Sequence, residues 1–471
     1  IFDRLLVLPL AIPTYIVAYC YVEVFDYSGP VQATLRWLLG AQTSRDYWFP
    51  DIRSMGGAIL VLSAVLYPYV YLSARASFIQ QSGRALEVAR TLGHSELAVF
   101  WSVAIPLARP ALIAGTALAM MECLNDLGAV EYLGIETLAV TIYTTWIQRA
   151  SLGGAAQIAT IMLLFVFALF TMEQASRGGA RYVGAGGKAP PIAFSELTGW
   201  RGLAAAGICA LPVLFGFVVP LAVLIDNAVT IGLDDIRPSF FAALRHSLTL
   251  AAIAALLAVA IGFLLAYAQR ISSNTNVRAT VRLAALGYAI PGTVLGLGLL
   301  TPLAGFDAYL NSWSLYLFGL SSGQIFAGTI FTLVLASLIR YLAVALGAID
   351  AGFQRISPNL DAAARTQGET TLTILWRVHL PILIPVLGAA GLMVFVDTMK
   401  ELPATLLLRP FNFETLATEV YNRASLAEFE EASFSALAIL VAGLAPVLLL
   451  HRTMAGRPER HRNRRPKDSV A

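Results

Sequence analysis

The hydrophobic residues are gathered in ten long apolar stretches, separated by shorter segments that carry most of the charge. Each stretch is close to the ~20 residues that an α-helix needs to cross the hydrocarbon layer of a bilayer. Such stretches are predicted to be helices, because lipid offers no hydrogen-bond partners to an open backbone. The predicted spans are residues 5–22, 55–74, 108–125, 155–172, 202–225, 247–268, 283–302, 324–346, 382–399 and 434–450.

Composition narrows the class of protein. Of the 471 residues, 58% are hydrophobic and 13% are charged, against roughly a quarter charged in an ordinary soluble domain. A disordered chain, a secreted disulfide scaffold and a plain cytosolic enzyme are excluded, and an all-α polytopic membrane protein in the lipid bilayer is predicted. Cys20, Cys123 and Cys209 lie far apart in apolar stretches, so neither a disulfide nor a metal motif is predicted. A net charge of +3 gives no indication of a nucleic-acid partner.

The segments between the spans alternate in charge. One set, with the tail after residue 450 and the N-terminal residues around Arg4, holds 22 Lys and Arg against 10 Asp and Glu. The opposite set holds 9 basic and 19 acidic residues. By the positive-inside rule the basic side is cytoplasmic, and the acidic excess on the far side predicts attraction for a cation or a basic partner face.

The sequence repeats itself after 275 residues. Residues 87–110 (EVARTLGHSELAVFWSVAIPLARP) and 362–385 (AAARTQGETTLTILWRVHLPILIP) match at nine of 24 positions, including one Gly, one Trp and two Pro. Six predicted spans separate the copies, so both face the same side and the repeat is parallel. The second copy follows four spans of its half and the first follows two, so we expect two further helices ahead of residue 5 and twelve spans in all.

The repeat predicts a domain organisation. A first half covers residues 1–173, a linker rich in Gly and Pro covers 174–200, a second half of six spans covers 201–451, and a basic cytoplasmic tail covers 452–471. Gly187-Lys188 in the linker lacks the Ser or Thr and the first Gly of a phosphate-binding loop. We therefore expect no ATP site and no bound cofactor in this chain.

Each repeated loop has the plan of a rigid turn. A short helical run meets Gly93 or Gly368, which permits a turn between two helices. A second short run follows, and Pro106 or Pro381 is expected to open the next span, because Pro is tolerated at a helix start. Two such loops on one side suit a two-fold symmetric partner.

These loops resemble the Glu-Ala-Ala loop of permease subunits in bacterial ABC importers that work with binding proteins. Glu87, Ala89, Gly93, Ile105 and Pro106 match the signature in the first copy. The second copy matches at Ala363, Gly368, Leu380 and Pro381, but Ala362 replaces the Glu, with Asp361 one place earlier. The resemblance covers the whole chain and implies a type I importer fold. It also implies that both loops dock on an ATPase dimer, which would bind the ATP and Mg, in the bacterial inner membrane.

Within that family the chain looks most like iron(III) permeases. The resemblance is carried by residues 11–32, 119–134, 141–148 and 393–425. It implies import of iron(III) from a periplasmic iron-binding protein, while thiamine permeases share the fused architecture and remain an alternative cargo class. A secondary transporter or channel is the alternative of another class, and it leaves the paired loops unexplained.

Acidic residues recur at the same shift. Glu122 pairs with Asp397, and Asp126 pairs with Glu401. The i, i+4 spacing predicts that each pair shares a helix face, and ionisable groups within a bilayer tend to line a water-filled path. Lys400 is expected to partner Asp397 or Glu401. We interpret these five residues as a candidate translocation pathway without a high-affinity metal site, because cargo must leave it again.

Two other interpretations of the carboxylates stay open. They cap helices or bind the periplasmic protein at the membrane edge, or Lys400 joins them in a structural ion bridge. Arg340 lies deep in the span 324–346, and we expect it to snorkel or to bond backbone carbonyls of a neighbouring helix. Gly292 and Gly296 predict close helix packing.

Overall fold

The computed structural model describes residues 2–80, 88–178, 197–232, 236–272 and 274–454, and these residues form helices joined by turns. Within these ranges nine helices are long and apolar enough to cross a membrane, or ten if a pair bent by 92° counts as one span. The prediction of an all-α polytopic membrane protein is confirmed. The linker at 179–196 and the tail from 455 lie outside the described residues.

The helices of the first half, in chain order, are α1 (Phe2–Leu5), α2 (Thr14–Phe25), α3 (Pro30–Leu39), α4 (Met55–Gln80), α6 (Glu96–Val99), α7 (Ile105–Asn125), α8 (Gly128–Tyr132), α9 (Leu138–Ile147) and α10 (Leu152–Gly178). Those that follow are α11 (Gly199–Val213), α12 (Val219–Ile231), α13 (Pro238–Ile271), α14 (Thr275–Ala285), α15 (Gly292–Phe318), α16 (Ile330–Gln354), α17 (Pro358–Thr366), α18 (Thr371–Ile374), α19 (Leu380–Met399), α20 (Pro403–Leu408), α21 (Leu416–Ser425) and α22 (Phe429–Met454).

Two predicted spans are broken helices. In the first half the break follows a 3-10 turn at Leu8–Ala11, and Pro13 then begins α2 with φ −59° and ψ 145°. In the second half the break follows a 3-10 turn at Leu286–Ala289, and Pro291 begins α15 with φ −58° and ψ 143°. The predictions of continuous spans at 5–22 and 283–302 are therefore wrong. Proline has no N–H and disfavours helical geometry in the residue before it, so each Ile-Pro step ends one helix and starts another.

Three long helices contain a π-helical turn that ends shortly before a proline. The turns are Phe100–Ala104, Leu214–Val218 and Leu375–His379, and each lies two residues ahead of a Pro: Pro106, Pro220 or Pro381. A wider turn accommodates the proline ring, which would otherwise clash with the carbonyl group one turn earlier. Pro106 and Pro381 lie in the first turn of α7 and α19, as predicted. The π-helical turns join these helices to α6 and α18, so each continuous helix begins about ten residues earlier, at Glu96 or Thr371.

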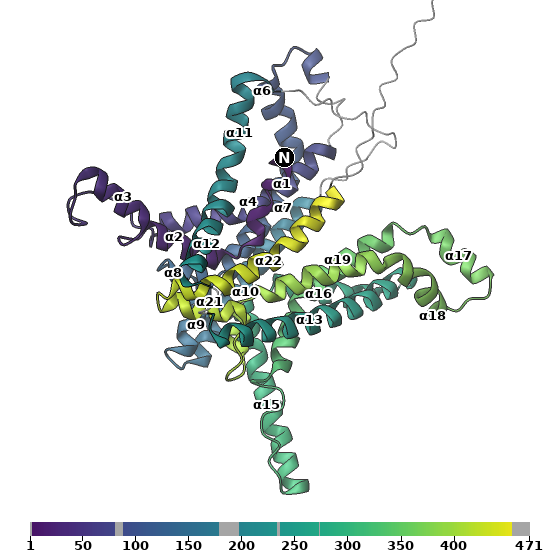
Figure 1. Ribbon diagram of the computed structural model, residues 1–471. Helices are drawn as coiled ribbons and strands as arrows, with labels where there is room; N and C mark the ends of the chain where they lie inside the picture. Colours follow the sequence, from purple (N-terminus) through teal and green to yellow (C-terminus); the bar gives the residue numbers. More distant parts are fainter. Residues whose placement is uncertain (1, 81–87, 179–196, 233–235, 273, 455–471) are drawn as a thin grey trace, which may run out of the picture.

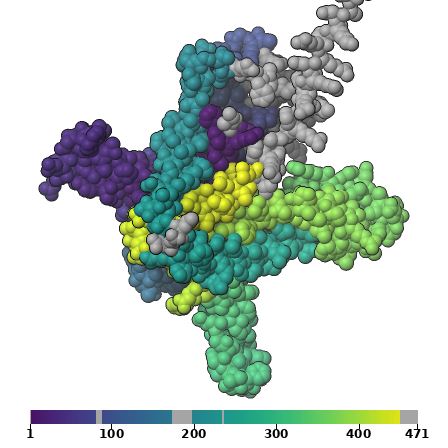
Figure 2. Space-filling model, viewed as in Figure 1, coloured from purple at the N-terminus to yellow at the C-terminus, as the bar shows by residue number. Residues whose placement is uncertain are grey.

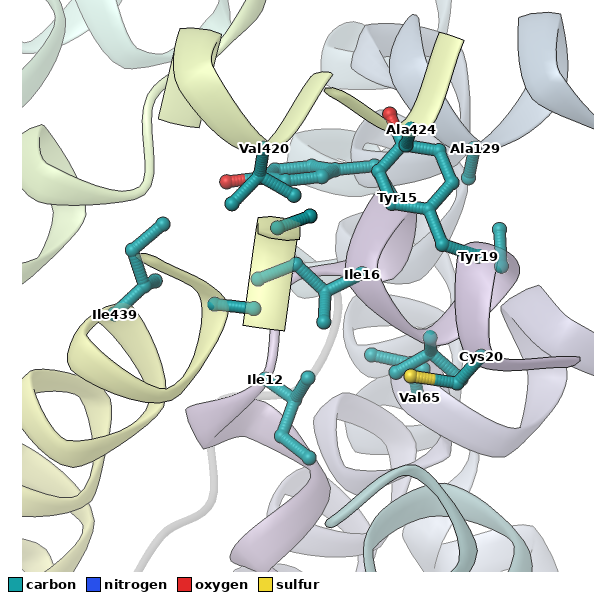
Figure 3. Close-up of a cluster of buried hydrophobic side chains, with 14 of the residues drawn as sticks. Ile12, Tyr15, Ile16, Tyr19, Cys20, Val65, Ala129, Val420, Ala424 and Ile439 are labelled. Carbon is teal, nitrogen blue, oxygen red and sulfur yellow. The ribbon is translucent and has the colours of Figure 1, made fainter. Parts of the chain in front are cut away.

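The two halves are interlocked. α11 and α12 follow the linker, yet Tyr21 of α2 donates a hydrogen bond to the Phe215 carbonyl oxygen at 2.8 Å, and Asn227 donates to Glu23 at 2.9 Å. The largest buried cluster draws on α2, α4, α8, α21 and α22 (Figure 3). Side chains from both halves therefore form one core.

Two hairpin arms project from the body, on the sides away from α6 and α17 (Figures 1 and 2). The first arm is residues 26–54, including α3, and the second is residues 307–329, including the end of α15. Each arm helix ends in a left-handed glycine, Gly40 with φ +68° and Gly319 with φ +67°. The three residues before each glycine are exposed and apolar: Trp37, Leu38 and Leu39 in the first arm, and Tyr316, Leu317 and Phe318 in the second.

The 3-10 turn of the first half packs closely on α22. A Cβ on Gly443 would overlap the carbonyl oxygen of Ala11, whereas a Cβ on Gly388 would have no neighbour within 4 Å. We expect Gly443→Ala to lower the free energy of unfolding by about 1–3 kcal/mol. Gly388→Ala, also in a helix, serves as the matched control and is expected to cause no loss. Thermal unfolding in nanodiscs measures both, and equal melting temperatures for the two variants would contradict the packing.

Candidate functional site

A cavity of about 330 Å³ lies where the two halves meet. The first half contributes polar residues from the broken span, α4 and the end of α7, and the second half contributes residues around the α15 break, α16 and the end of α19. The polar lining residues are Thr14, Tyr15, Tyr69, Glu122, Asn125, Asp126, Tyr288, Arg340, Tyr341, Asp397, Lys400 and Glu401. All five predicted pathway residues are among them.

The sequence of α16 indicates where the cavity lies across the bilayer. Its residues 330–349 carry one charged side chain, Arg340, and 20 helical residues extend ~30 Å, the thickness of the hydrocarbon layer. Arg340 lies halfway along this segment and lines the cavity. The cavity is therefore near the middle of the bilayer.

Asp126 joins the end of one helix to the start of another. α7 ends at Asn125, and the Asp126 carboxylate accepts hydrogen bonds from the backbone N–H groups of Ala129 at 2.9 Å and Val130 at 3.3 Å. It also accepts a hydrogen bond from the Thr14 hydroxyl. The carboxylate thus satisfies backbone donors at the start of α8 that lipid would leave unpaired.

Glu401 repeats this arrangement 275 residues later. α19 ends at Met399, and Glu401 accepts a hydrogen bond from the backbone N–H of Ala404 at 3.1 Å, at the start of α20. Tyr341 donates its hydroxyl to Glu401 at 2.6 Å. The prediction that each acidic pair shares one helix face is wrong, because Asp126 and Glu401 lie beyond the helices that carry Glu122 and Asp397. Both carboxylates cap helices, as one of the open interpretations had it, but they line the cavity and do not lie at the membrane edge.

Arg340 forms an ion pair with Glu401. Both side chains are buried, with 6% and 7% of their surfaces exposed. The expectation that Arg340 snorkels or binds carbonyl groups is therefore wrong. A carboxylate is the stronger partner, because a buried guanidinium needs an opposite charge.

The ion pair between Lys400 and Asp397 is more exposed than the one between Arg340 and Glu401. Lys400 lies 2.8 Å from Asp397, with 32% and 24% of the two side chains exposed. Glu122 accepts a hydrogen bond from the Tyr288 hydroxyl at 3.0 Å, a neutral partner. Two of the four carboxylates thus form an ion pair, with Arg340 or Lys400, while Glu122 and Asp126 form none among the described residues.

Sequence reasoning missed the tyrosines of this cavity. Tyr15, Tyr69, Tyr288 and Tyr341 all line it, although tyrosine in a membrane protein is usually expected at the interface. A signal was present, because Tyr15 and Tyr288 lie within three residues of Pro13 and Pro291, which mark equivalent breaks. The described residues contain no group of three or more His, Cys, Asp or Glu side chains that could hold a metal ion.

The repeated loops, residues 88–104 and 358–379, lie at the far ends of the helices that reach the cavity. Gly93 has φ +88° and Gly368 has φ +82°, as expected for a turn that requires glycine. Ser95 and Thr370 then cap the following helices by accepting hydrogen bonds from backbone N–H groups three residues on. The α7 and α19 helices run directly from these loops to Glu122 and Asp397.

The predicted loop residues lie in different environments. Ala89 is buried, Ile105, Pro106 and Leu380 are half-buried, and Gly93, Ala363, Gly368 and Pro381 are exposed. Glu87 lies outside the described residues. Asp361 is half-buried and pairs with Arg270 and His379 within the chain.

The first part of the chain matches a known protein family. Residues 1–176 match the family described as "Binding-protein-dependent transport system inner membrane component". This part of the chain belongs to that family. The match agrees with the resemblance of the first repeated loop to permease subunits of such transport systems.

Individual relatives extend the comparison beyond residue 176. The chain is 25% identical over 402 residues, 84% of its length and 76% of the relative, to the "Fe(3+)-transport system permease protein FbpB 2" of Haemophilus influenzae. It is 30% identical over 178 residues, 36% of its length and 61% of the relative, to the "Putative 2-aminoethylphosphonate transport system permease protein PhnU" of Salmonella typhimurium. Among solved structures, a bacterial alginate ABC transporter is similar with a TM-score of 0.43 and 17% identity, over 54% of this chain and 93% of that one.

The buried ion pair of this permease gives a double-mutant test. Arg340→Met leaves Glu401 without its cation, and we expect a loss of about 3–5 kcal/mol in the free energy of unfolding. Glu401→Gln is expected to be similarly costly. The double variant should cost less than the sum of the two, because neither charge is then left alone.

Arg377→Gln is the control, since Arg377 makes an exposed pair with Glu369 at 3.7 Å and exposed pairs contribute little. Denaturant titration in detergent micelles measures all four variants. Additive costs at Arg340 and Glu401 would contradict the pairing.

Proposed function

We propose that this permease is the translocation subunit of an ATP-driven importer that carries iron(III) from a periplasmic binding protein into the cytoplasm. The observation that carries the proposal is the joint geometry of cavity and loops. One helix from each half, α7 or α19, connects an exposed loop on one side to a carboxylate in a cavity near mid-bilayer. Movement of the loops would therefore reach both walls of the cavity.

The two loops suit an ATPase dimer as partner. Each carries exposed apolar side chains at matching positions of the repeat: Leu97 and Trp101 in the first loop, and Leu372 and Trp376 in the second. Exposed apolar residues in a loop are typical of a protein interface. ATP and Mg would bind to that partner, and the loops and the basic tail would face the cytoplasm.

The cavity suits a hard cation that passes through. Carboxylate and phenol oxygens are the ligands that trivalent iron prefers, and Glu122 and Asp126 form no ion pair among the described residues. The absence of a preformed cluster among the described residues suits transient contact rather than storage. The similarity to an Fe(3+)-transport permease over 84% of the chain supports the same cargo.

A zwitterionic solute is the second candidate. Lys400 and Arg340 add positive charge beside the carboxylates, and such a lining could hold an amine and an anion together. The similarity of 178 residues to a putative 2-aminoethylphosphonate permease favours this cargo specifically.

ATP hydrolysis by the reconstituted complex tests cargo and architecture together. The binding protein is added empty, or loaded with iron(III), thiamine or 2-aminoethylphosphonate. We expect stimulation by the iron-loaded protein alone. Stimulation by another cargo alone would overturn iron and keep the importer, while no association with an ATPase would favour a secondary transporter.

The pathway carboxylates give the second test. We expect Glu122→Gln with Asp397→Asn to lower iron uptake at least tenfold, because the double variant removes negative charge from both walls of the cavity. Glu136→Gln, which alters an exposed carboxylate on the α8–α9 loop, is the matched control and should leave uptake unchanged. Uptake by the double variant at the wild-type rate would show that the carboxylates are not on the path.

The arms give a test of the outer partner. We propose that the two lobes of the binding protein contact the two apolar tips, since each tip follows the broken span of its half and lies away from the loops. Trp37→Ser with Tyr316→Ser is expected to weaken binding of the loaded protein more than tenfold, with little dependence on salt because the contact is apolar. Surface plasmon resonance on nanodiscs measures it, and unchanged affinity would remove the arms from the interface.

A further inference from the structure

A polar cluster, defined here as Arg270, Asp361 and His379, joins the second repeated loop to two long helices. Asp361 lies in α17, the exposed short helix of that loop. Its carboxylate accepts hydrogen bonds from Arg270 Nε at 2.8 Å and lies 2.6 Å from His379 Nε2. Arg270 belongs to the last turn of α13, and His379 ends the π-helical turn that leads into α19. The cluster therefore ties α17 to α13 and α19.

Arg270 also ties down the end of α16. Its Nη1 donates to the Phe353 carbonyl oxygen at 2.8 Å and its Nη2 to the Ile356 carbonyl oxygen at 3.1 Å. The Phe353 carbonyl group lies in the last turn of α16 and the Ile356 carbonyl group two residues beyond its end, where the helix supplies few N–H donors of its own. The Arg270 guanidinium thus binds the end of α16 through two carbonyl groups and helix α17 through Asp361.

His379 is held on its other faces by aromatic rings. No part of its side chain is exposed, and its ring lies 5.5 Å from Tyr267 and 5.4 Å from Phe353, measured between ring centroids. Tyr267 in turn donates its hydroxyl to the Thr371 carbonyl oxygen at 2.7 Å, at the start of α18. Hydrogen bonds to a charged group in such a dry setting are strong and directional.

The first loop is built differently at the same positions of the repeat. Ala104 stands where His379 stands in the second copy, and Leu86, outside the described residues, stands where Asp361 does. The described ion pair of the first loop is Arg90 with Glu96 at 3.5 Å, with 57% and 86% of the side chains exposed. A pair this exposed adds little rigidity.

We infer that Asp361 is a positioning residue rather than a docking residue. Through Arg270 and His379 it makes α17 and α19 move as one rigid body. A displacement of the second loop then reaches Asp397 and Lys400 at the other end of α19 without loss. This inference rests on the proposed ATPase coupling and gives Asp361 a role inside the permease.

Asp361→Asn in the full permease separates positioning from docking. It keeps the size of the side chain but removes the charge that holds both partners. The affinity of the ATPase subunit for the nanodisc-embedded permease is expected to stay within twofold of wild type. Uptake per ATP hydrolysed is expected to fall about tenfold. Arg270→Lys, which keeps the charge but loses the hydrogen bonds to α16, is expected to act in the same direction.

Glu136→Gln is the control, because Glu136 is an exposed carboxylate on the α8–α9 loop, outside both repeated loops. It should change neither quantity. A more than tenfold loss of ATPase affinity in Asp361→Asn, with the wild-type ratio of uptake to hydrolysis, would overturn the inference and make Asp361 a docking residue.

A second readout does not depend on any partner. Spin labels at Asn359 in α17 and Ile384 in α19 report the distance between the two helices in the permease alone. We expect a broader distance distribution in Asp361→Asn than in wild type, and no change in Glu136→Gln. An unchanged distribution would overturn the inference even if uptake falls. If the wild-type permease binds no ATPase, the proposed function fails, and this distance still decides whether the cluster holds the two helices together.

Discussion

The structure depends on one constraint: backbone groups at helix ends inside the bilayer must find hydrogen-bond partners in the protein. Four helix starts meet around the cavity, at Pro13, Gly128, Pro291 and Pro403. Three of them carry a proline, which has no N–H that needs a partner. At the Gly128 and Pro403 starts, the carboxylates of Asp126 and Glu401 accept the backbone N–H groups of the residues that follow. Broken helices near mid-bilayer thus place acidic residues in the lining of the cavity.

The same constraint explains why the carboxylates differ in role. Asp126 and Glu401 are committed to helix starts, and Glu401 also balances Arg340. Glu122 and Asp397 lie one turn earlier, inside the helices, where the backbone is already satisfied. Their oxygens face the cavity with a hydroxyl or a lysine as partner. Negative charge in the cavity is therefore partly structural and partly available to cargo.

Much of this arrangement could be predicted from the sequence. The apolar stretches gave the helical class, and the 275-residue repeat identified the loops, the turn glycines and the acidic pairs. The helix breaks could not be predicted by hydropathy, because Ile12 and Ile290 are as apolar as their neighbours and only the following prolines distinguish them. The π-helical turns before Pro106 and Pro381 follow from a steric clash one turn back, which a count of residues per span does not register. The partner of Arg340 was missed because it lies 61 positions away in sequence, outside any local spacing rule.

The central claim is that the cavity opens to one side of the membrane at a time, driven from the loops. Access to Met393, an uncharged lining residue on α19, measures this directly. The three native cysteines are replaced by alanine, Met393 by cysteine, and a membrane-impermeant thiol reagent is added to either side of proteoliposomes that hold the permease with its ATPase. The account predicts labelling from the cytoplasmic side without nucleotide and from the opposite side with bound ATP and loaded binding protein. Labelling from one fixed side, or from both sides at once in every condition, would contradict it.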